Sequence, residues 1–186
     1  IAIQLSKLRF FISLICDQKT NRNKGKNHGV KPLPNLETKF VAADTLIGLA
    51  KDTQMNLFKS SRVVEIERKL QQVRHDYFAV QNRHKKLGLQ SKDKLLRDSL
   101  ADELMQEAFA DQNTSLKLAK WNPYDPHVAA DFFEPLWMFD CSMADGFDIV
   151  IGNPPYIQIQ KFTKPQKDKW VAQHYETYSA TADIYC

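Results

Sequence analysis

The chain has 186 residues, 43% hydrophobic and 26% charged, with a formal net charge of +4, which excludes a highly charged disordered chain. Its three cysteines are widely spaced and odd in number, which argues against a disulfide framework and against a zinc site. No apolar run is long enough to span a membrane, and we expect a cytoplasmic protein. We also expect that it binds no metal.

The first segment predicts a helix. Apolar side chains recur at helical spacing from Ile1 to Ile15, and polar residues interrupt them too often for a signal peptide. The helical pattern begins without a start signal. We therefore expect the sequence to be a fragment of a longer protein.

Basic residues are unevenly distributed. Residues 1–36 hold seven Lys or Arg against one acid, four lysines lie within 161–169, and residues 121–160 hold no Lys or Arg. Such flanks suit a protein that holds nucleic-acid phosphates beside its pocket, and Lys161 and Lys164 are candidate contacts. For residues 19–31 the alternative is a solvated, disordered loop.

A short strand is predicted at Phe40–Ala43, after a proline-rich segment that cannot be helical. Asp44 follows at its carboxyl end, and Thr45 and Leu46 come next. Asp44 has two possible roles, as the cap of a helix beginning near Leu46 or as a carboxylate that binds a ligand.

Residues 51–120 predict an antiparallel helical hairpin. Apolar residues alternate by three and four positions from Val63 to Leu87, which is a heptad seam. Gly88 is predicted to end this helix, and Ser91 to cap a second one. The hairpin is long for a connection, so we expect it to contact other domains of a parent protein.

Residues 121–146 are the most aromatic part of the chain, and their prolines predict an extended or irregular segment. Aromatic side chains of this kind form either part of a core or a surface on which bases stack. We expect the core role.

The run Phe147–Ile151 is short, apolar and β-branched, which is typical of a central parallel strand. It leads into Asn153, Pro154, Pro155 and Tyr156. Each proline fixes φ and removes a donor, so the turn is stiff and rich in acceptors, at the end of a strand where α/β sheets bind ligands. The alternative is that these residues form only a turn.

Asn153–Tyr156 after this strand resembles the catalytic motif of methyltransferases that use S-adenosylmethionine, above all the N6-adenine DNA methyltransferases. Four further segments, in this order, resemble the Eco57I type of fused restriction-modification methylases: Pro32–Leu36, Ala43–Leu46, Trp137–Phe139 and Asp145–Asp148. The resemblance covers most of residues 1–50 and 121–186.

The resemblance implies an α/β fold, a partial doubly wound Rossmann-like sheet into which the helical hairpin is inserted. Residues 1–50 would form the first part of the methyltransferase core, 51–120 the insertion, and 121–186 the part with the catalytic motif. Residues 181–186 look like the start of the strand that follows this motif.

The resemblance also implies residue roles. The side-chain carbonyl of Asn153 and the backbone carbonyl of Pro154 would accept the two hydrogen bonds of an adenine amine, and Tyr156 would stack on the base after it is flipped from double-stranded DNA. Asp44 would accept a hydrogen bond from the adenine amine of the cofactor, with Thr45 and Leu46 packed on the ring.

Two parts of such a site are missing from the sequence, a glycine-rich loop and a carboxylate for the ribose hydroxyls. We therefore expect residues 1–186 alone to bind S-adenosylmethionine weakly or not at all, and to be inactive. Three alternatives remain open: methylation of RNA adenine, methylation of a protein glutamine amide, and a non-catalytic interaction module that uses the hairpin.

Overall fold

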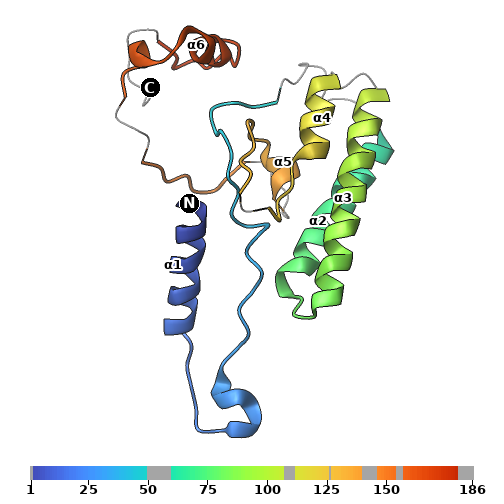
Figure 1. Cartoon of the computed structure of the whole chain (residues 1–186), viewed down its shortest axis with the longest axis vertical. Coiled ribbons are helices and arrows are strands. Elements are labelled where there is room, and N and C mark those ends of the chain that lie inside the picture. The colour runs from blue at the N-terminus through green and yellow to red at the C-terminus, as the bar shows by residue number, and fades with distance from the viewer. Residues whose placement is uncertain are drawn as a thin grey trace.

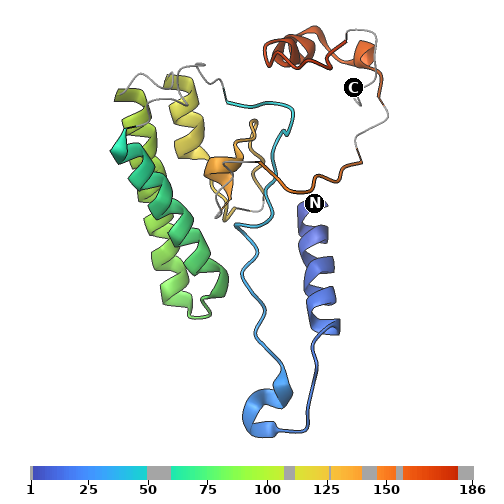
Figure 2. The same cartoon turned by 180° about the vertical axis from the view of Figure 1, so that it is seen from behind.

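The computed structural model describes residues 2–49, 60–106, 112–125, 127–139, 146–153 and 157–179. Its elements, in chain order, are α1 (Ala2–Cys16), η1 (Lys24–Gly29), α2 (Ser61–Ala79), α3 (Arg83–Gln106), α4 (Gln112–Lys120), α5 (Pro135–Met138), η2 (Ile159–Lys161) and α6 (Lys164–Val171). Helices α2, α3 and α4 lie on one side of an extended central segment, residues 30–49, and α1 lies on the other side (Figures 1 and 2).

The predicted doubly wound sheet is wrong. The described residues contain no β-strand, and one isolated parallel bridge joins Ala43 to Ala130. The predicted strand Phe147–Ile151 lacks regular secondary structure, and Ile149, Val150 and Ile151 are 77%, 81% and 92% exposed. A strand is stable only when neighbouring strands pair with its backbone, and no such pairing reaches 147–151 from the other described residues.

The hairpin of α2 and α3 is antiparallel, because three residues join two long helices that pack along their length. Its seam buries side chains from both helices, and these continue into α4. The buried apolar residues of the three helices are Val63, Ile66, Leu70, Val73, Tyr77, Leu100, Ala101, Leu104 and Leu118. Burial of an aliphatic side chain contributes about 1.5–3 kcal/mol, so this seam holds the helical part together.

The turn of the hairpin lies at residues 80–82, not at Gly88, which is inside α3. The Asn35 side-chain amide donates to the backbone oxygens of Tyr77 and Val80, both at 2.6 Å. These hydrogen bonds add to the bond that the Tyr77 carbonyl accepts from the Val80 N–H, and they help to satisfy the carbonyls at the end of α2. Asn35 therefore ends the helix from more than forty residues away, and Gly88 costs α3 about 1 kcal/mol relative to alanine without breaking it.

The aromatic segment packs against the hairpin. Buried Trp121, Phe132, Trp137 and Met138 belong to the same core cluster as the seam residues. The Trp137 indole N–H also donates to the Glu67 carboxylate of α2 at 2.6 Å. The expected core role of this segment is confirmed, although the surface that it covers is a pair of helices.

A buried ionic network ties the hairpin to this segment. The Asp93 carboxylate is 0% exposed and accepts hydrogen bonds from Arg74 Nε at 2.7 Å and Arg97 Nε at 2.8 Å. Arg74 also donates to the Trp137 carbonyl, and Arg97 to the Trp121 carbonyl. The two guanidinium groups thus connect both helices with the backbone that follows α4.

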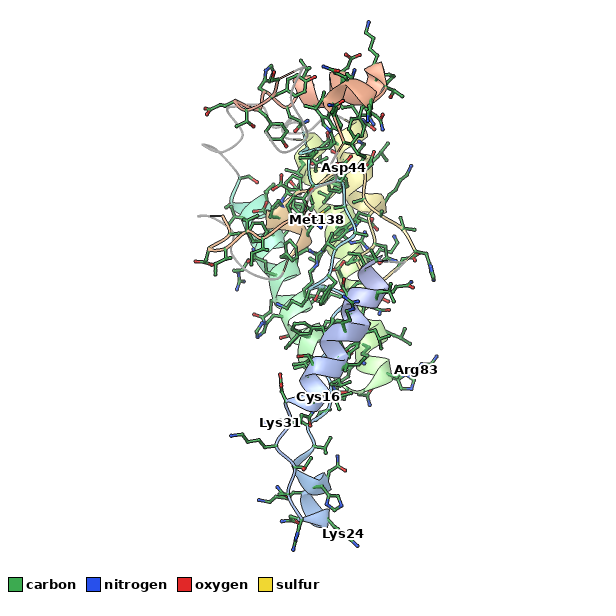
Figure 3. The ribbon with its side chains drawn as sticks, turned by 90° about the vertical axis from the view of Figure 1, so that its left-hand side faces the viewer. Cys16, Lys24, Lys31, Asp44, Arg83 and Met138 are labelled. Atoms are coloured by element: carbon green, nitrogen blue, oxygen red, sulfur yellow. The ribbon has the colours of Figure 1, made fainter. Side chains whose placement is uncertain are left out.

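Helix α1 confirms the first predicted element. It contains no buried residue, and its ring contact with the central segment joins Phe10 to Phe40 at a centroid distance of 5.8 Å. The loop after it is closed by the Gln18 side chain, which donates to the Lys31 carbonyl and accepts from the Lys31 N–H. These contacts favour an ordered loop over a disordered one. In Figure 3, Lys24 lies at the lower end of the molecule and Lys31 lies near Cys16, both well below Asp44.

Candidate functional site

Asp44 lies in a turn that is bonded to the aromatic segment. Its N–H donates to the Ala130 carbonyl at 3.0 Å, and the Ala130 N–H donates to the Ala42 carbonyl at 2.8 Å. Farther along, the Phe133 N–H donates to the Ile47 carbonyl at 2.7 Å. Backbone hydrogen bonds on both sides of Asp44 therefore fix its position relative to the core.

The Asp44 side chain shapes the turn from within. Its Oδ1 accepts the Leu46 N–H at 3.2 Å, and its backbone oxygen accepts the Ile47 N–H at 3.2 Å. Residues 45 and 46 form a turn, and no helix begins between 46 and 49. Asp44 thus bonds to the N–H two residues ahead, as in an Asx turn. It does not cap a helix within these residues.

The exposed groups of this turn are of the kinds expected for binding the adenine ring of S-adenosylmethionine. Asp44 and Thr45 are exposed, and Leu46 is half-buried beside them. A carboxylate has about four acceptor positions, so an exposed one can bind an amine while it also accepts the Leu46 N–H. A fixed acceptor next to an apolar side chain is the combination that an adenine ring with an exocyclic amine requires.

The segment that leads to Asn153 contacts the same region through Phe147. The Phe147 ring is stacked on Phe133, with centroids 6.4 Å apart and planes 13° apart, and meets the edge of Phe139 at 5.9 Å. Since Phe133 is bonded to Ile47, this aromatic cluster connects the Asn153 segment with the Asp44 turn. Asn153 itself is exposed. Pro154, Pro155 and Tyr156 lie outside the described residues, as do residues 181–186.

Lys161 and Lys164 lie on one short helical unit after the motif, at the end of η2 and the beginning of α6, and both are exposed. The Phe162 and Trp170 rings pack edge to face at 4.9 Å and hold η2 against α6. The Gln166 side chain accepts the Thr163 N–H at 3.1 Å, which stabilises the beginning of α6. The two lysines are therefore presented to solvent from a defined unit.

The residues after α6 return to the Asp44 turn. The Tyr175 hydroxyl donates to the Leu46 carbonyl at 3.0 Å, and the Gly48 N–H donates to Gln173 Oε1 at 2.9 Å. Partial burial, and then the negative charge of Asp44, raise the pKa of the Tyr175 phenol, so its hydroxyl stays a proton donor at neutral pH.

A model of the Eco57I restriction-modification methylase family matches residues 1–186, the whole of the sequence. The chain belongs to the Eco57I restriction-modification methylase family. No curated protein and no solved structure matches the chain. Membership in the Eco57I family implies a methyltransferase with a role in DNA methylation, and therefore the use of S-adenosylmethionine and contact with DNA.

Sequence reasoning missed the hydrogen bonds that Gln173 and Tyr175 make with the Asp44 turn. The two residues lie 125 and 129 residues from their partners in the turn, and no local pattern marks such contacts. No described helix is long and apolar enough to cross a membrane. No group of three His, Cys, Asp or Glu among the described residues is placed to hold a metal ion.

Proposed function

We propose that this chain carries the catalytic site of an enzyme that methylates N6 of adenine in double-stranded DNA with S-adenosylmethionine. The observation that carries the proposal is the family match over residues 1–186, together with Asn-Pro-Pro-Tyr at 153–156. The sequence has no glycine-rich cofactor loop, so we infer that the site is completed within a larger restriction-modification or defence enzyme.

Residues 1–50 and 121–186 would carry the chemistry, and the hairpin within 51–120 would support them through the ionic network. Hydrogen bonds and ring contacts already link the Asp44 turn, the segment that leads to Asn153, and residues 173–175. This convergence supports a cofactor site at Asp44, Thr45 and Leu46 close to the catalytic motif.

The chemistry explains the residue types at 153–156. The lone pair of an adenine amine is delocalised into the ring, so the amine is a poor nucleophile. The two N–H groups of the amine would donate hydrogen bonds, one to the Asn153 side-chain oxygen and one to the Pro154 carbonyl. These hydrogen bonds would localise the lone pair on the nitrogen. Pro155 would keep the turn stiff and hold the amine in line with the methyl group. When bound, S-adenosylmethionine would supply that methyl group from its sulfonium sulfur. The new nitrogen–methyl bond would replace the sulfur–methyl bond, S-adenosylhomocysteine would leave as a neutral thioether, and the amine would lose one proton to solvent.

Tyr156 and the lysines would serve the DNA. The adenine amine is out of reach inside a duplex, so the base has to leave the stack, and the Tyr156 ring would replace part of the lost stacking. Lys161 and Lys164 are exposed on the unit that follows the motif, where they would contact backbone phosphates.

Replacement of Tyr156 tests the flipped base. In the protein that carries this chain, Tyr156→Ala is expected to weaken binding to target DNA by about 1–3 kcal/mol, because one base loses its stacking partner. The measurement is a titration with duplexes that contain 2-aminopurine at the target adenine, whose fluorescence rises on unstacking and is quenched by a stacked ring.

Tyr156→Phe is the matched control, because it keeps the ring and removes only the hydroxyl; it should bind with nearly unchanged affinity. If Tyr156→Ala leaves both the fluorescence and the affinity unchanged, the residue does not face a flipped adenine. Methylation of a protein glutamine amide would then be favoured over methylation of DNA.

A further inference from the structure

Two hydrogen bonds attach residues 173–175 to residues 46–48. Each of these stretches is bonded through its first and its last residue. One joins the Tyr175 hydroxyl to the Leu46 carbonyl, and the other joins the Gly48 N–H to the Gln173 side chain, at 3.0 and 2.9 Å. Gln173 and Tyr175 follow the catalytic motif in the sequence, and Leu46 and Gly48 follow Asp44. Two attachment points restrict the rotation of the turn, which a single hydrogen bond would leave free.

The turn is held from a second direction as well. The carbonyl of Ile47, which lies between the two attachment points, accepts the Phe133 N–H at 2.7 Å. Residues 46–48 are thus bonded to the aromatic segment and to the segment after α6. Asp44 comes two residues before this doubly bonded stretch, and its own side chain bonds to the Leu46 N–H. The position of Leu46 therefore helps to set the position of the Asp44 carboxylate.

Gly48 leaves room for the close approach of the Gln173 side chain. A Cβ atom at position 48 would lie 3.1 Å from Gln173 Oε1, which is tighter than ordinary van der Waals contact. An alanine there would shift the Gln173 amide by a few tenths of an ångström and so lengthen its hydrogen bond with the Gly48 N–H. Gly88 is a suitable comparison, because a Cβ atom at that position would meet nothing within 4 Å.

We infer that Gln173 and Tyr175 are positioning residues for the cofactor, which hold the Asp44 turn in the shape that binds its adenine. The inference rests on the proposed function, and it deepens it by making the segment after the catalytic motif part of the cofactor site. Binding linkage is reciprocal, so the cofactor in turn stabilises the docking of residues 157–179, which include Lys161 and Lys164.

The test compares Tyr175→Phe with Tyr178→Phe in the protein that carries this chain. Each variant loses one hydroxyl from the same segment, but only Tyr175 donates to the turn. A neutral hydrogen bond contributes about 0.5–1.5 kcal/mol, so Tyr175→Phe should raise the Kd of S-adenosylmethionine, measured by calorimetry, about two- to tenfold. Tyr178→Phe should leave this Kd unchanged.

Gly48→Ala, compared with Gly88→Ala, tests the second attachment point. Gly48→Ala should also raise the cofactor Kd and KM, while kcat at saturating cofactor and the midpoint of urea unfolding stay close to those of the unaltered protein. A fall in unfolding midpoint or in kcat that matches the loss of affinity would overturn the positioning role.

Failure of the positioning role can be distinguished from failure of the proposed function. If the unaltered protein binds the cofactor and all four variants bind it equally well, the positioning role is wrong and the proposed function stands. If the unaltered protein does not bind S-adenosylmethionine, both are wrong.

Discussion

Asn153→Ala should lower the methylation rate of the protein that carries this chain by about two orders of magnitude or more, while cofactor affinity stays nearly the same. The side-chain oxygen of Asn153 would accept an amine hydrogen bond that strengthens as the methyl group is transferred. An interaction of this kind lowers the barrier without tightening the ground state. The measurement is kcat under saturating DNA and cofactor, with calorimetry for the cofactor Kd.

Asn113→Ala is the matched control for this change. Asn113 is exposed on α4 and lies far from both Asp44 and Asn153 in the sequence, so its loss should leave the rate unchanged. Equal losses of cofactor binding and rate in Asn153→Ala would instead indicate that Asn153 shapes the turn and does not polarise the amine.

Asp93→Ala should destabilise the fold by about 3–5 kcal/mol, because it leaves two buried guanidinium groups without their carboxylate. Arg74 is 0% exposed and Arg97 is 3% exposed, so water cannot replace the lost partner. The same arginines bind the carbonyls of Trp121 and Trp137, and these contacts will weaken when the carboxylate is removed. The measurement is the free energy of unfolding from urea titration.

Asp98→Ala removes the same side chain from the same helix, but from an exposed pair with Lys94 at 2.7 Å. Such a pair contributes about 0.3–0.5 kcal/mol, so the unfolding midpoint should hardly move. A loss in Asp93→Ala as small as that in Asp98→Ala would mean that the buried network does not hold the hairpin to the aromatic segment.

The sheet could not be predicted correctly from local pattern. Apolar, β-branched residues at 147–151 favour extended backbone, but pairing depends on a second strand that a local pattern cannot supply. In the structure this segment is bound to the rest through Phe147, at its first residue. The bridge between Ala43 and Ala130 illustrates the same limit of local pattern. The predicted strand that ends at Ala43 pairs with Ala130 at this single position, and no ladder of hydrogen bonds extends from it in the described part of the chain.

The hairpin illustrates what periodicity does determine. The apolar spacing from Val63 to Tyr77 identified residues that are buried in α2. Its continuation to Leu87 was wrong, because Leu87 is exposed in α3 and the Asn35 side chain ends α2 first. Periodicity identifies the buried face of a helix, while its end was set here by a hydrogen bond from a distant residue.

The candidate site also contains one residue that a local pattern marks and contacts that no local pattern marks. Asp44 was predicted from a local signal, a carboxylate at the end of a short apolar run, and the structure places it in a turn. Its cofactor role stays a prediction. The contacts of Gln173 and Tyr175 with this turn could not be found, since nothing near either residue marks a partner more than a hundred residues away. The positioning role inferred for them rests on the three-dimensional arrangement alone.

The central proposal is tested most directly by identifying the methylated atom. The protein that carries this chain is incubated with methyl-labelled S-adenosylmethionine and unmethylated DNA of high sequence diversity, and the DNA is digested to nucleosides for mass spectrometry. We predict label in N6-methyldeoxyadenosine, and its loss in Asn153→Ala. Label in methylated cytosine, or label found only in RNA or in protein glutamine when these are supplied, would contradict the proposal.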